Sequence, residues 1–264
     1  VMGYAGHAGP ADARRVTELL AYDLDNPSSI AGSLAAAREN ARGARVVVSS
    51  EVWECLNATW NELPHTEELA RRLGPHLYFR YIRERTAMLA GLVDATLSRD
   101  DTWRFLALGR SLERVDMTTR LLSSSISDDP NSQSWVSLLR SCGAHEAYLR
   151  TYRRAVDADR VAEFLLLDRL FPRSVYWSLA LAEQILAELD TGRRRGRATV
   201  DDLARRMVGR ARTELEFRGI DELVAEMPDL LASLQRTCSA VSSAVTRRYF
   251  AREAPRAWAS EVPA

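Results

Sequence analysis

Residues 20–37, LAYDLDNPSSIAGSLAAA, recur as residues 165–182, LLLDRLFPRSVYWSLALA, so that each residue has its counterpart 145 positions later. Eight positions carry the same residue in both copies: Leu20, Asp23, Pro27, Ser29, Ser33, Leu34, Ala35 and Ala37 in the first. In each copy a helix ends, the chain turns at an aspartate and a proline, and a serine caps the next helix. A structural unit that occurs twice predicts a fold built from two related units.

Apolar residues recur at helical spacing along the whole chain, and no stretch alternates as a half-buried strand would. We therefore predict an all-α protein, a pseudo-repeated antiparallel bundle of long helices. Pro64 should separate the second helix from the third. The expected helices are Ala11–Tyr22, Ser28–Leu63, Thr66–Leu97, Asp101–Ile126, Gln133–Val156, Ser174–Leu189, Val200–Phe217 and Asp221–Phe250.

The repeat divides the chain into a first unit, residues 1–98, a second unit, residues 99–252, and a flexible tail, residues 253–264. The second unit places about 60 residues before its turn, whereas the first has only about 20. The first unit is either short by nature or truncated at its N-terminus, and we favour truncation. Truncation predicts an exposed apolar patch on the helices around Ser28 and Thr66, where the missing counterpart would pack.

Charge and composition exclude several classes of function. The 36 basic residues are all arginine, and they balance 36 acidic residues to a formal charge of zero. General attraction to nucleic acid or to an anionic membrane is therefore not expected. The absence of lysine excludes a P-loop lysine, a Schiff base and a Ser-Lys dyad. No stretch approaches the roughly 18 apolar residues that a membrane span needs.

Cysteine and histidine placement favours neither disulfides nor metals. Cys55, Cys142 and Cys238 are odd in number, far apart and each within a helical pattern, so we expect reduced thiols and a cytoplasmic location. Glu62 and His65 have the spacing of a di-iron ligand pair, but Pro64 should end the helix between them. We expect no metal site and no cofactor.

The helix from Trp103 to Ile126 combines charges with apolar residues on both of its sides. One stripe, which includes Leu108, Leu112 and Val115, is an ordinary core face. The opposite side carries Arg110, Glu113 and Arg114, which are candidates for a functional cluster. We expect these charges to be buried and paired, Asp116 with Arg120 among them, and a structural ion-pair network is favoured about two to one over a substrate site. The candidate cluster consists of Arg110, Glu113 and Arg114 with Asp168 and Arg173 at the second turn.

A second candidate site lies along the helix that begins near Ser28. Arg38, Arg42 and Arg45 follow one another at steps of four and three, and Trp53 and Trp60 continue the same stripe. Three guanidinium groups on one side of a helix could bind a carboxylate or a phosphate through paired hydrogen bonds. Pairing of these arginines with nearby glutamates is an equally good interpretation.

Five segments resemble the signature of the bacterial alpha-E domain family, which is named for a Glu-Arg pair. They are 25–30 (DNPSSI), 37–42 (ARENAR), 50–57 (SEVWECLN), 108–122 (LGRSLERVDMTTRLL) and 164–175 (FLLLDRLFPRSV). The resemblance covers about residues 19–250. It implies an all-α fold and an association with ATP-grasp type ligases and transglutaminase-like proteins that make or modify a peptide.

Three functions remain open from the sequence. The leading hypothesis is a helical accessory or substrate-presenting partner of an ATP-grasp type peptide ligase. The second is an enzyme that uses Glu113 as an acid or base while Arg110 and Arg114 orient an anionic or peptide substrate. The third is a purely structural scaffold, and the chain could also form a homo-oligomer. A solvent-reachable cleft at Glu113 would favour the enzyme.

Overall fold

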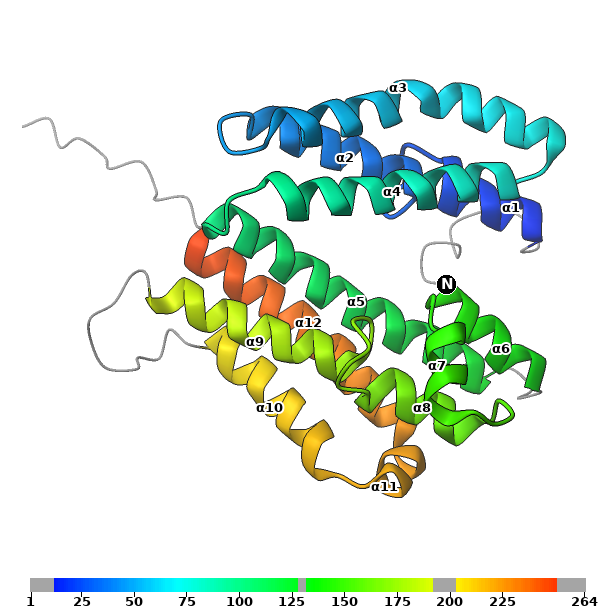
Figure 1. Cartoon of the computed structure of the whole chain (residues 1–264), viewed down its shortest axis with the longest axis vertical. Helices are drawn as coiled ribbons and strands as arrows, with labels where there is room; N and C mark the ends of the chain where they lie inside the picture. Colours follow the sequence, from blue (N-terminus) through cyan, green and yellow to red (C-terminus); the bar gives the residue numbers. More distant parts are fainter. Residues whose placement is uncertain (1–11, 128–131, 192–202, 251–264) are drawn as a thin grey trace, which may run out of the picture. The chain divides into compact units, whose positions relative to one another are not determined.

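The computed structural model describes residues 12–127, 132–191 and 203–250, and within these ranges the chain is helical and contains no strand (Figure 1). The predicted all-α class is confirmed. The predicted tail, residues 253–264, lies outside the described residues. The helices are α1 (Ala13–Thr17), the π-helix η1 (Glu18–Tyr22), α2 (Ile30–Gly43), α3 (Ser50–Leu73), α4 (His76–Thr96), α5 (Asp101–Ser127), α6 (Ser132–Ser141), α7 (His145–Tyr152), α8 (Ala158–Leu167), α9 (Val175–Thr191), α10 (Leu203–Phe217), α11 (Ile220–Ala225) and α12 (Met227–Tyr249).

The chain forms two compact units, Val1–Trp103 and Arg104–Ala264. Their boundary falls in the first turn of α5, a few residues after the position that the repeat gives. In the first unit, α3 packs against both α2 and α4. In the second unit, α10 packs against α9 and α12, and α5 runs beside them (Figure 1).

An aromatic pair centres the core of the first unit. Tyr78 is fully buried, its ring meets the ring of Tyr22 edge to face at 4.8 Å, and its hydroxyl donates to the carbonyl of Ala21. Burial raises the pKa of Tyr78 because the phenolate would lose its hydration there. Leu63 and Ala70 of α3 complete this cluster. The core therefore joins the turn before α2 to both later helices.

The repeated turn is built by the same hydrogen bonds in both units. The hydroxyls of Ser29 and Ser174 donate to the carbonyls of Asp23 and Asp168, each at 2.5 Å. Each serine oxygen also accepts a backbone N–H three residues later, which is the bond of a helix N-cap. Each aspartate carboxylate accepts the N–H two residues later, at 2.9 Å in both units. The prediction of a repeated turn is confirmed at the level of its hydrogen bonds.

Two of the expected helix boundaries are wrong. The helix expected over Ser28–Leu63 is two helices, because α2 ends at Gly43 and α3 begins only at Ser50, capped by the Ser49 hydroxyl. Pro64 does not end a helix, since α3 continues through it to Leu73. Residues on both sides of the proline, Leu63 and Thr66 among them, are buried, so packing compensates for the backbone hydrogen bond that proline cannot donate.

Two other long helices are also divided. The stretch expected as Gln133–Val156 turns at Gly143, whose φ of +61° lies in the left-handed region, and it forms α6 and α7. The stretch expected as Asp221–Phe250 forms α11 and α12, and Pro228 lies in the first turn of α12. The helix expected over Thr66–Leu97 is divided as well, because Gly74, at φ +122°, ends α3 and α4 begins at His76.

We expect Ser29→Ala and Ser174→Ala each to lower the free energy of unfolding by about 1–3 kcal/mol, because both serines are fully buried and each removal leaves a buried carbonyl and a helix N–H without a partner. Urea unfolding followed by circular dichroism measures the loss. Ser28→Ala, at an exposed serine of the same turn, is the matched control and should change little. Equal effects of all three substitutions would contradict the assignment of the caps.

Candidate functional site

The Glu-Arg helix, α5, buries only one of its two sides. Leu108, Val115 and Leu122 are at most 2% exposed, as the sequence predicts for the core stripe. On the opposite side, Leu106 and Met117 are about 40% exposed. The expectation of a helix buried on both sides is wrong, because apolar residues on that side face solvent rather than another helix.

Glu113 is exposed, which corrects the expectation that it is buried in an ion-pair network. It lines a surface hollow of about 330 Å³ between α5 and α12, together with Asp116, Arg120 and Cys238. Asp116 and Arg120 form the expected pair one helical turn apart, at 2.6 Å. The charged side of α5 is therefore a solvated edge beside α12.

The thiol of Cys238 is the potential nucleophile of this hollow, and its surroundings keep it protonated. Burial, followed by the nearby carboxylates of Asp116 and Glu113, raises the pKa of Cys238 to about 12. Since a thiolate is the nucleophilic form, a thiol with such a pKa is a poor nucleophile near neutral pH. The hollow therefore lacks an activated cysteine.

The structure brings Arg114, Asp168 and Arg173 to the second turn, as expected. Their side chains form hydrogen bonds with backbone groups. Arg114 donates to the carbonyl of Pro172 at 3.3 Å, and Arg173 donates to the carbonyl of Cys142 at 3.3 Å. The Asp168 carboxylate accepts N–H groups of its own turn. Arg110, further back on α5, is half-buried. Arg114, Asp168 and Arg173 hold α5, the turn and the α6–α7 corner together, which is a structural role.

We expect Glu113→Gln to change the free energy of unfolding by less than about 0.5 kcal/mol, since the side chain is exposed and such surface substitutions have small effects. Thermal unfolding of the variant beside the unmodified chain measures this. A loss comparable to that of Ser174→Ala would restore the buried-network hypothesis.

The three arginines of the second candidate site each contact a side chain of their own unit. Arg42 pairs with Glu39 at 2.6 Å, as the alternative interpretation expects. The Arg45 guanidinium lies 4.4 Å from the centre of the Trp53 ring, a cation–π contact. Arg38 donates to the Asn57 side chain at 2.9 Å and lies between Trp53 and Trp60, 5.8 and 5.9 Å from the two ring centres. These contacts favour a stacked surface over a convergent anion site.

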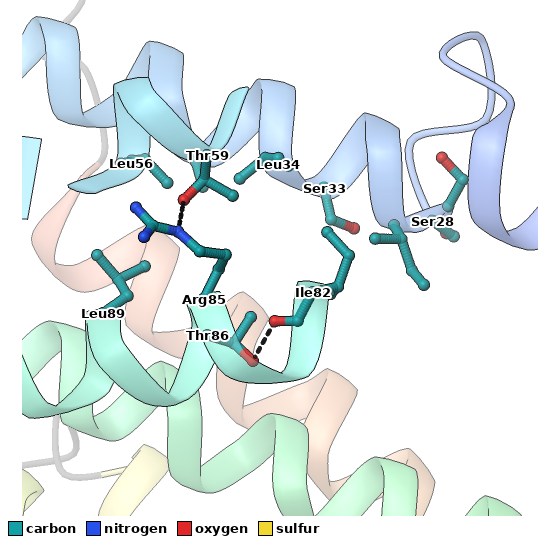
Figure 2. A pocket seen from close by; sticks show the side chains of 12 residues that line it. Ser28, Ser33, Leu34, Leu56, Thr59, Ile82, Arg85, Thr86 and Leu89 are labelled. Carbon is teal, nitrogen blue, oxygen red and sulfur yellow. Dashed lines mark hydrogen bonds between the residues drawn. The ribbon is translucent and has the colours of Figure 1, made fainter. Parts of the chain in front are cut away.

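A mostly apolar groove in the first unit is a candidate binding site (Figure 2). It encloses about 330 Å³ between α2, α3 and α4, and apolar side chains form most of its lining. Its apolar and hydroxyl side chains include Ile30, Ser33, Leu34 and Ala37 of α2, Leu56 and Thr59 of α3, and Ile82, Thr86 and Leu89 of α4. We call this set the α2–α4 groove. It lies on helices where the repeat predicts an uncovered apolar patch.

Arg85 is the charged residue that lines the α2–α4 groove, and the sequence analysis did not single it out. Its guanidinium donates to the Thr59 hydroxyl at 2.8 Å (Figure 2). It also donates to the Cys55 carbonyl at 3.0 Å. The available signal was an arginine on the stripe of α4 that also carries Tyr78, Ile82 and Leu89. Arg85 ties α4 to α3 and leaves the groove with an apolar character.

A polar network in the second unit was also missed. Arg212 of α10 pairs with Glu183 of α9 at 2.7 Å and with Glu216 at 2.5 Å, and the Tyr176 hydroxyl donates to Glu216. Arg169 reaches the same carboxylate at 3.0 Å. The four-residue spacing predicts the Arg212–Glu216 pair. The contacts of Glu183, Tyr176 and Arg169 depend on how α9 and the turn pack against α10, so the sequence does not predict them. The network joins three segments of the unit.

The described residues contain no group of three or more His, Cys, Asp or Glu side chains placed to hold a metal ion. Glu62 and His65 lie on one continuous helix, since Pro64 does not interrupt α3, and both are exposed. Among the helices of the described ranges, none combines the length and the apolar character that crossing a membrane requires.

Two compact helical units, the Asp-Pro-Ser turn that both contain and a Glu-Arg helix define an all-α protein. The chain belongs to the Alpha-E family, described as a predicted alpha-helical domain with a conserved ER motif, whose model matches residues 2–250. In this chain Glu113-Arg114 within the signature segment is the Glu-Arg pair on which the resemblance rests.

Relatives are found in mycobacteria. Uncharacterized proteins of Mycobacterium bovis and Mycobacterium tuberculosis are 25% and 24% identical to the chain over 238 residues, which is 86% of this chain. The chain spans about a quarter, 27%, of the length of these relatives. No solved structure matches the chain.

Proposed function

We propose that the protein is a helical accessory partner of an ATP-grasp type peptide ligase system, with transglutaminase-like proteins as further candidate partners, and that it binds protein rather than catalysing a reaction. Membership of the Alpha-E family supports this proposal through the association that the family resemblance implies. The observation that carries it is the α2–α4 groove, an apolar surface of the kind that binds a partner side chain or helix.

The chemistry of the candidate residues also favours binding. Arg114 and Arg173 donate to main-chain carbonyls, and the Cys238 thiol is protonated near neutral pH. The two arginines hold the second turn to neighbouring segments, and a protonated thiol is a poor nucleophile. A binding role needs none of them to be reactive.

Reconstitution with the ligase tests this function. We expect the chain to form a complex with an ATP-grasp type peptide ligase encoded beside it, measured by size-exclusion chromatography with light scattering. ADP release by the ligase should rise when the chain is added, and the chain alone should release none. Absence of a complex together with an unchanged rate would contradict the proposal.

A second candidate function, an enzyme that uses Glu113, is favoured by one observation. Glu113 faces solvent in a hollow that it shares with Asp116 and Arg120, so a substrate could reach the carboxylate. Glu113→Gln separates the two functions in the reconstituted reaction, since the substitution is not expected to unfold the protein. We expect the variant to stimulate the ligase as the unmodified chain does. Loss of product by a folded variant would favour the enzyme.

A further inference from the structure

The α2–α4 groove corresponds to a surface that is fully covered in the second unit. On α2 it exposes or half-exposes Ile30, Ser33, Leu34 and Ala37. Their counterparts 145 positions later are similar or identical, and all are at most 1% exposed: Val175, Ser178, Leu179 and Ala182. The same pattern of side chains is thus buried in one unit and uncovered in the other.

The helix that runs beside α9 in the second unit is α5 (Figure 1). Arg104, near its start, pairs with Glu188 near the end of α9 at 3.1 Å. Later in α5, Arg114 and Thr118 donate to the carbonyls of Pro172 and Arg173, just before α9 begins. These bonds at both ends show that α5 runs antiparallel to α9.

The opposite wall of the groove is formed by α4, and in the second unit α12 lies beside α5. This wall of the groove consists of Arg85, Thr86 and Leu89 of α4. In the second unit Cys238, Ser239 and Ser242 of α12 line the space beside α5. In the second unit α5 therefore lies beside both α9 and α12, whereas the α2–α4 groove of the first unit is open among the described residues.

We propose that the α2–α4 groove binds an amphipathic α-helix of a partner protein, seated as α5 is seated on α9. The inference rests on the proposed protein-binding role but not on the ligase as the partner. The bound face should resemble the buried stripe of α5, with leucine, valine and threonine at positions i, i+3, i+4 and i+7. An arginine and a threonine four residues apart would donate to the carbonyls of Pro27 and Ser28, the counterparts of the acceptors that α5 uses.

A partner protein is a better source of this helix than a second copy of the chain. The α5 of a second copy is already held in its own unit by the bonds of Arg104, Arg114 and Thr118, and exchange would have to break them. A helix from another protein could bind without breaking these bonds of α5.

A synthetic peptide of residues 101–127, the sequence of α5, is the probe. We expect the fluorescein-labelled peptide to bind the full chain saturably, measured by fluorescence anisotropy, and to gain helical circular dichroism on binding. Ala37→Trp fills the groove from an exposed position and should weaken binding at least about tenfold. Ala36→Trp, an exposed neighbour on α2 that does not line the groove, is the matched control and should change affinity less than about twofold.

Ser33→Trp is a second groove variant, and thermal unfolding of every variant shows whether it is folded. Peptide binding that neither groove variant weakens, or absence of binding by a folded chain, would overturn the inference. Analytical ultracentrifugation tests whether the bound helix comes from a partner protein or from a second copy of the chain. A dimer that Ala37→Trp dissociates would overturn the partner-protein inference in favour of a second copy. Peptide binding without ligase binding would support the groove as a helix-binding site and reject the ligase as the partner. Ligase binding without peptide binding would reject only the groove as a helix-binding site.

Discussion

Phe164→Ala is expected to lower the free energy of unfolding by about 3–5 kcal/mol. Phe164 is 1% exposed at the end of α8, where its ring stacks on Phe171 at 5.0 Å and meets Tyr148 edge to face at 5.8 Å. Removal of the ring leaves a cavity between the turn and α7, and the neighbouring rings lose their contacts. Urea unfolding of the second unit, followed by near-ultraviolet circular dichroism, measures the loss.

The same substitution at Phe217 is the matched control. Phe217 ends α10 with 81% of its surface exposed, so Phe217→Ala should change the free energy of unfolding by less than about 0.5 kcal/mol. If the two phenylalanine variants were equally stable, the aromatic cluster around Phe164 would not be a core of the second unit.

Gly32→Ala is expected to destabilise the first unit by about 1–3 kcal/mol. A Cβ atom at this position would lie 2.3 Å from the carbonyl oxygen of Asn26 and 3.2 Å from the Cα of Pro27. Both neighbours are backbone atoms of the turn, so relief of the clash must move the turn itself. The higher helix propensity of alanine, about 0.5–1 kcal/mol, offsets only part of this cost.

Gly91→Ala is the opposite case and provides the control. Gly91 lies within α4, and a Cβ there would meet no atom within 4 Å. The substitution should therefore stabilise the chain by about 0.5–1 kcal/mol through helix propensity alone. Thermal and urea unfolding of both variants test the contrast. Stabilisation by both substitutions would show that the turn adapts to a side chain at position 32.

Local chemistry made the class of the fold and the repeated turn predictable. Asp23, Pro27 and Ser29 and their counterparts have intrinsic roles as carboxylate acceptor, helix breaker and cap, and these act over a few residues. The same serine and aspartate bonds therefore form in both units. Helix boundaries were less predictable, since buried neighbours keep Pro64 inside α3.

The candidate site was only partly predictable, because the sequence pattern does not show which side of a helix meets another. Arg114 and Arg173 meet at the turn as expected, yet Glu113 on the same helix faces solvent. Periodicity identified the core stripe correctly, but the apolar residues on the opposite side of α5 also suggested burial there. Neighbouring helices in the second unit cover one side and leave the other exposed.

The sequence by itself determined the all-α class, the repeated capped turn and the membership of the Alpha-E family, since these depend on local propensities and on residue identity at fixed spacing. Only the tertiary structure decided that Gly32 lies against a backbone carbonyl, whereas its counterpart in the other unit is Trp177. It alone also decided that Leu34 lines an open groove while Leu179 is buried. The reason is that burial depends on which distant helix covers a surface, and two similar local sequences can differ in that.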